Sequence, residues 1–156
     1  MNKLNTIKTI KLVRSAIEDR AEWLYFLYKE MEKAFGKKKA EELARKAIRK
    51  SGHFKAKKRG KTDTPGKWVK KHSKSISCLV FKSKAIKVSK DIGELHLHYC
   101  PLVKAWQKLG ATKKEISLLC DIAMEGDRGR AEIEGLEIEI PKKIGKGDKF
   151  CSLLIF

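Results

Sequence analysis

The chain has 156 residues, of which 42% are hydrophobic, and this length fits one domain that buries a single core. Its 37 basic and 19 acidic side chains leave a net charge of +18. The most apolar run, Trp23–Tyr28, has only six residues, which excludes a membrane span. The four cysteines lie too far apart for a Cys-x-x-Cys metal knuckle, and the N-terminus has no secretory pattern. We therefore expect a soluble, cytoplasmic protein with reduced thiols.

The positive charge is concentrated in the first part of the chain. Residues 1–91 hold 27 basic and 9 acidic side chains, whereas residues 92–156 hold 10 of each. The densest stretch, Lys55–Lys74, contains turn residues, and only Trp68 and the preceding Phe54 offer aromatic rings for stacking. Such a stretch could bind phosphate groups, but no nucleic-acid-binding motif is present. We interpret it as a solvated surface and expect neither specific nucleic-acid binding nor membrane binding.

The first 53 residues favour a helical hairpin. Residues 10–35 have apolar side chains at steps of three, four and seven, and residues 37–51 form a second amphipathic stretch that Gly52 is expected to close. Aromatic residues from Trp23 to Tyr28 would wrap more than one face of the first helix. This pattern indicates burial on several sides, and a homodimer is one way to supply it.

The rest of the chain predicts a sheet with further helices. Residues 54–75 read as a basic loop and a short helix near 65–73. Residues 78–88 and 94–100 should form an antiparallel hairpin, and residues 136–140 and 149–156 two more strands. Helices are expected at 101–109 and from 113 to about 126–129, so that residues 76–156 form a sheet with two inserted helices. The predicted class is α+β: the hairpin packs on a roughly four-stranded, mainly antiparallel sheet.

The strongest candidate site is the predicted strand end at residues 96–101. Side chains alternate along a strand, so His96, His98 and Cys100 should share one face and Tyr99 the other. Pro101 suits the first position of a helix, which makes Cys100 the N-cap. Helix dipole and imidazoles would then favour a thiolate near neutral pH. The alternatives are ordinary packing, or a zinc site formed by the three side chains, although alternate strand residues are widely spaced for one ion.

Two further groups of polar residues are candidates. Asp121, Asp127 and Arg128 lie on or after a predicted helix, where an acid could orient a histidine or activate water and the arginine could hold a carboxylate. An ion-paired helix end explains the same residues. Asp148 follows a glycine-rich turn, and it either closes that turn or projects into the cleft.

Several segments in order resemble the L-2-amino-thiazoline-4-carboxylic acid hydrolase family: His98–Trp106, Leu109-Gly110, Leu119–Gly129, and Gly147-Asp148 with Cys151. The resemblance covers most of the chain and implies hydrolytic opening of a 2-amino-thiazoline ring to N-carbamoyl-L-cysteine. The ring carbon needs a nucleophile, the leaving sulfur a proton donor and the carboxylate a cation.

For this chemistry, Cys100 and His98, with Asp121 or Asp127, are the candidate catalytic residues. The candidate substrate-binding residues are Arg128, His96, Tyr99 and Asp148. We expect a small anionic metabolite as the ligand and no required cofactor. The alternative is a non-catalytic module that uses the same cleft to bind a small molecule or a metal. The basic N-terminal half departs from what the resemblance to this family implies, and it would suit a different substrate or partner.

Overall fold

Residues 3–59 form two long helices because this stretch contains no proline and repeats apolar side chains at helical spacing. In the computed structural model, which describes residues 3–60, 62–74 and 76–156, α1 spans Lys3–Phe35 and α2 spans Lys37–Arg59. Gly36 joins them with φ of 76°, a conformation that favours glycine. The predicted hairpin is therefore confirmed, but both helices are longer than predicted.

Helix α2 does not end at Gly52, where the sequence predicted a stop. A Cβ atom at this position would overlap the carbonyl oxygen of Gly126 and lie 3.1 Å from the backbone nitrogen of Arg130. Gly129 approaches the backbone of Arg49 just as closely. These glycines therefore allow two helices to cross at short distance, and the residues after Gly52 stay helical.

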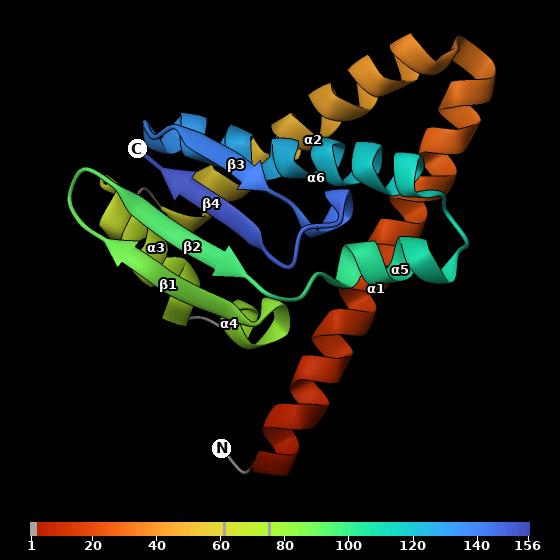
Figure 1. Ribbon diagram of the computed structural model, residues 1–156. Coiled ribbons are helices and arrows are strands. Elements are labelled where there is room, and N and C mark those ends of the chain that lie inside the picture. The colour runs from red at the N-terminus through yellow and green to blue at the C-terminus, as the bar shows by residue number, and fades with distance from the viewer. Residues whose placement is uncertain (1–2, 61, 75) are drawn as a thin grey trace.

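Six α-helices and four strands form the part of the chain that the structure describes (Figure 1). The predicted strand at 78–88 begins instead as a short helix, and the helix after Thr112 continues past Gly129 because its C-cap is Gly135. Thr112 and Glu115 form the expected capping box. After the hairpin the elements are α3 (Pro65–Lys74), α4 (Ile76–Phe81), β1 (Ser83–Val88), β2 (Gly93–Leu97), α5 (Pro101–Lys108), α6 (Lys113–Glu134), β3 (Ile138–Lys142), the 3-10 turn η1 (Ile144–Lys146) and β4 (Cys151–Ile155).

The sheet is antiparallel throughout, in the order β1-β2-β4-β3. Strands β1 and β2 form the predicted hairpin, and the last strand inserts between β2 and β3. In this register His96 lies opposite Ser152 of β4. The predicted α+β class with a four-stranded antiparallel sheet is confirmed.

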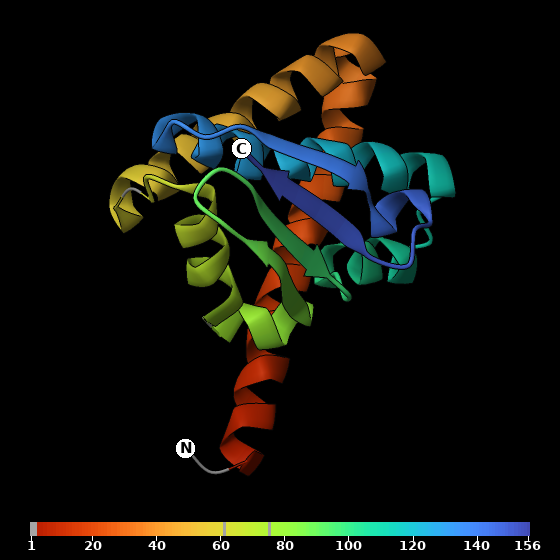
Figure 2. The ribbon, with the colours of Figure 1, turned by 60° about the vertical axis from the view of Figure 1, so that its left-hand side comes forward.

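Helices cover one face of the sheet and leave the other open, as Figures 1 and 2 show. Leu95 and Leu153 point to the covered face and are each 2% exposed. Helix α5 packs on α1, where the indole N–H of Trp106 donates a hydrogen bond to the backbone carbonyl of Ala21. No helix among the described residues combines the length and apolar character of a membrane span.

Candidate functional site

Two imidazoles lie together on the open face of the sheet, where β2 ends. The His96 ring stacks on Phe150 with 4.2 Å between ring centroids, and the His98 centroid lies 5.5 Å from that of Phe150. The two imidazole centroids are 6.1 Å apart. The expectation that both histidines share one strand face is confirmed.

A carboxylate orients one of these imidazoles. Nε2 of His96 lies 2.6 Å from Oε1 of Glu94, and the hydroxyl of Ser152 donates to the same oxygen at 3.1 Å. The hydrogen bond from His96 lowers the pKa of Glu94, so this carboxyl group is ionised at neutral pH. Sequence reasoning missed Glu94, although it precedes His96 by two residues on the same strand face.

The second imidazole has a different environment. His98 is exposed and its pKa is lowered, chiefly by partial desolvation and then by the charges of Lys84 and His96. It is therefore a neutral imidazole, able to accept a proton, at pH 7. Lys142 of β3 adds a cation, with Nζ 4.9 Å from the Phe150 ring centroid. The sequence could not show Phe150 against His98 or Lys142 over Phe150, since only the strand register brings these residues together.

Cys100 does not join the histidines. Strand β2 ends at Leu97, and Cys100 is the extended N-cap of α5 with Pro101 at the first helical position, as predicted. The residue is only 8% exposed. Burial raises the pKa of its thiol to about 12, and the N–H groups of Val103 and Leu102 only partly oppose this. The expected thiolate near neutral pH is therefore wrong, because desolvation outweighs the helix start.

The neighbours of Cys100 are other thiols. Cys120 of α6 and Cys151 of β4 both act on its pKa, and all three are buried and free. The backbone N–H of Ile144 donates to the sulfur of Cys151 at 3.3 Å. Burial raises the pKa of both neighbouring thiols, that of Cys151 to about 11. No group of three or more metal-binding side chains is arranged around a common point in the described residues.

Asp121 lies within an ion network on the covered side of the sheet. Its carboxylate accepts from Arg45 at 2.8 Å, from Arg128 at 3.1 Å and from the buried ammonium of Lys143. Burial raises the pKa of Asp121, but hydrogen bonds from Lys143, Arg128 and Arg45 together lower it far below the usual range. Arg128 also donates to Glu125 at 2.6 Å. Both arms of the guanidinium are thus occupied, and the network joins α2, α6 and the residue that precedes η1.

Asp127 belongs to a separate, partly buried cluster. It pairs with Arg130 at 2.8 Å, and Arg130 in turn contacts Nε2 of His72. Nδ1 of His72 lies 2.7 Å from the carbonyl of Trp68, so the neutral ring donates there and accepts from Arg130. Burial, followed by the charge of Arg130, lowers the pKa of His72 to about 4.

The remaining predicted residues lie apart from these groups. Asp148 accepts the backbone N–H of Lys143 at 2.7 Å and closes the η1 turn, the simpler of its two predicted roles. Tyr99 lies under Arg14 of α1, whose guanidinium carbon is 4.1 Å from the ring centroid. Only His96 and His98, of the predicted site residues, meet on the open face of the sheet.

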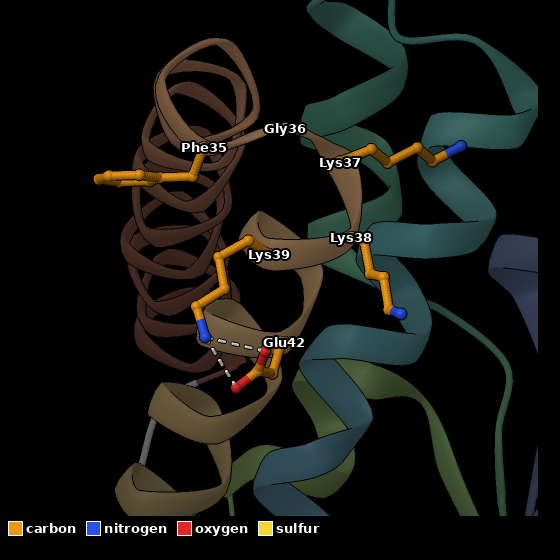
Figure 3. Close-up of a pocket in the computed structure, with 6 residues that line it drawn as sticks. All are labelled: Phe35, Gly36, Lys37, Lys38, Lys39 and Glu42. Carbon is orange, nitrogen blue, oxygen red and sulfur yellow. Dashed lines mark hydrogen bonds and ion pairs between the residues drawn. The ribbon is translucent and has the colours of Figure 1, made fainter.

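The surface at the tip of the helical hairpin is hollowed, but it holds no catalytic grouping. Figure 3 shows Phe35 on one side of Gly36 and three lysines that begin α2 on the other. Lys39 donates to both carboxylate oxygens of Glu42, at 3.1 and 3.0 Å. Neither a histidine nor a cysteine lines this hollow.

A protein-family model described as L-2-amino-thiazoline-4-carboxylic acid hydrolase matches residues 14–155, nearly the whole chain. Among solved structures, the chain is similar to a trafficking protein particle complex subunit 3 from Naegleria fowleri covalently bound to palmitic acid. The identity is 14% and the TM-score is 0.60, with 99% of this chain and 95% of that chain covered. This likeness concerns the fold. No curated protein matches the chain.

Proposed function

We propose, from the premise that the chain belongs to the L-2-amino-thiazoline-4-carboxylic acid hydrolase family, that it hydrolyses a small cyclic amidine bearing a carboxylate on the open face of the sheet. One observation carries the proposal: two imidazoles, an ionised carboxylate, an aromatic ring and a lysine gather there from β2, from β3 and from the segments that follow β2 and precede β4. The preferred substrate class is 2-amino-thiazoline-4-carboxylate, which opens to N-carbamoyl-cysteine.

The reaction adds one water to the ring carbon between nitrogen and sulfur. His98, neutral at pH 7, takes a proton from water as its oxygen attacks that carbon. The carbon–sulfur bond then breaks, and the leaving sulfur takes a proton from His96, which Glu94 orients through Nε2. His98 then passes its proton to the ring nitrogen, and the hydroxyl proton of the intermediate restores His96 as the oxygen becomes the carbamoyl carbonyl. The two hydrogens of the water are thus accounted for by the new N–H and S–H bonds. Lys142 attracts the carboxylate, and Phe150 offers an apolar surface to the ring.

The proposal gives Cys100 no part in the attack. With a thiol pKa of about 12, roughly one side chain in 10⁵ is ionised at pH 7. Arg128 and Asp121 are likewise left out, because each is satisfied by the other and by neighbouring ion pairs. A non-catalytic module that binds an anionic metabolite at the same histidines is the competing function.

The test compares purified wild-type protein with His98→Gln, His96→Gln and Cys100→Ala, incubated with L-2-amino-thiazoline-4-carboxylate and followed by mass spectrometry for N-carbamoyl-cysteine. We expect turnover in the wild type and in Cys100→Ala, and a loss of about 10²–10⁴-fold in His98→Gln. His53→Gln is the matched control, since that histidine pairs with Glu132 on another part of the surface.

Other results decide between the alternatives. Activity that survives in His98→Gln and disappears in folded Cys100→Ala would replace the imidazole mechanism with a thiol nucleophile. A wild type without turnover, whose melting temperature rises with carboxylate ligands and does so less in His98→Gln, would establish the binding module instead.

A further inference from the structure

One side of α1 is apolar and uncovered. Trp23 is 74% exposed, Leu27 60% and Phe26 56%, whereas Ala21 and Tyr28 on the inward side are 0% and 2% exposed. The surface is hollowed between the three exposed side chains. Figures 1 and 2 show the N-terminal end of α1 projecting beyond the rest of the molecule. An exposed tryptophan and phenylalanine side by side mark an interaction surface.

The exposed side of α1 follows the spacing of a helix-pairing seam. Starting at residue 16, alternating steps of four and three residues lead to residue 34 and select six positions. On a helix these six positions fall within an arc of about 80°. All six side chains are exposed. We call them the α1 seam: Ala16, Arg20, Trp23, Leu27, Glu30 and Ala34.

The α1 seam is complementary to itself when two copies run antiparallel. With the twofold axis midway between Trp23 and Leu27, Trp23 of each copy meets Leu27 of the other copy. In the same register Arg20 lies opposite Glu30, and two alanines allow close approach at each end. A twofold interface requires that each residue and its contact exchange places in this way. We propose that α1 forms an antiparallel, twofold-symmetric homodimer through this seam.

Charge favours a second copy over other partners. The chain carries +18, yet residues 16–34 contain five acidic and three basic side chains, so two copies would meet at a segment that does not share the positive charge of the whole chain. Nucleic acid or anionic lipid would face net negative charge there. Arg20 has no ion pair with any residue that the structure describes, and Glu30 has only its exposed pair with Lys33. Both are therefore available to pair across the seam at little cost.

The exposed area also suits a dimer. Trp23, Phe26 and Leu27 together expose roughly 400–500 Å² of apolar surface per copy. A specific interface buries about 800 Å² on each partner, so these three side chains supply about half, and the flanking polar positions of two long helices supply the remainder.

The first experiment is sedimentation equilibrium of the full chain at micromolar concentrations. We expect the wild type to sediment at twice its chain mass of 17.8 kDa and Trp23→Glu at the chain mass. The variant should keep its circular dichroism spectrum, since Trp23 is exposed in the single chain. Lys11→Glu, an exposed charge change off the seam, should leave the dimer intact. A monomeric wild type, or a dimer unaffected by Trp23→Glu, overturns the proposal.

A second experiment tests the register. Arg20→Glu and Glu30→Arg each place like charges opposite one another twice, so each alone should weaken the dimer at least tenfold. Mixed together, the two variants become complementary and should form a heterodimer, and the double variant should dimerise with itself. If neither combination restores association, the antiparallel register is wrong. Capture of a different protein with no self-association would replace the second copy by another partner.

Discussion

Replacing Gly52 by alanine tests whether the close crossing of α2 and α6 sets the stability of the fold. The added Cβ would overlap the carbonyl oxygen of Gly126 and lie 3.0 Å from its carbonyl carbon and 3.1 Å from the nitrogen of Arg130. All three are backbone atoms, which cannot rotate away, so the helices must separate. That movement also strains the Arg49–Glu125 pair, now 2.8 Å long.

Overpacking costs about 1–3 kcal/mol, and alanine recovers up to about 1 kcal/mol of helix propensity. Because the overlapping atoms are rigid, we expect Gly52→Ala to lower the free energy of unfolding by about 1–2 kcal/mol. This loss corresponds to a decrease of roughly 2–8 °C in melting temperature for a chain of this size.

The assay is urea unfolding followed by circular dichroism, with Gly126→Ala as the matched control. A Cβ at Gly126 would lie 3.5 Å from the side chain of Ile48 and 3.9 Å from its carbonyl oxygen, both ordinary contacts. That variant should be unchanged or up to about 1 kcal/mol more stable. Equal stabilities of Gly52→Ala and the wild type would refute the argument that backbone contact holds the two helices at this distance.

Two further predictions follow from buried titratable groups. Cys100 should react with iodoacetamide at pH 7 only as the protein unfolds, and therefore more slowly than the half-buried Cys78. Mass spectrometry of peptides measures both rates, and faster labelling of Cys100 would contradict its burial. The unfolded chain protonates His72 near pH 6.5 but the native state only at about 4, so its contribution to stability is complete above pH 6.5 and is lost as the pH falls toward 4. Between pH 7 and pH 4 the free energy of unfolding of His72→Gln should therefore fall less than that of the wild type, by up to roughly 3 kcal/mol, as measured by urea unfolding. Parallel pH profiles of the two proteins would show instead that the ring titrates normally.

Much of the fold was predictable because its signals are local. The break at Gly36, the capping box at Thr112 and the N-cap at Cys100 depend on residues within a turn of each other. The errors came from contacts between distant residues. Gly52 looks like a helix stop until Gly126 is placed beside it, and α4 forms on the helical side of the sheet from a segment with strand composition.

The candidate site was half predictable for the same reason. Period-two alternation placed His96 and His98 on one face, and this required only the strand itself. Lys142 ends β3 and Phe150 comes just before β4, and the position of Phe150 against the histidines and of Lys142 over its ring depends on the register of β4 between β2 and β3.

The sequence by itself determined the α+β class, the helix ends set by local caps, the family membership and the alternation that pairs the histidines. The tertiary structure alone decided the state of each candidate group, because ionisation depends on burial and on charges from other elements. Desolvation in the core raises the pKa of the Cys100 thiol, whereas three cations from three elements hold Asp121 ionised. Side chains that look equally reactive in the sequence therefore differ in the structure: those on the open face of the sheet remain available for reaction, whereas those in the core do not.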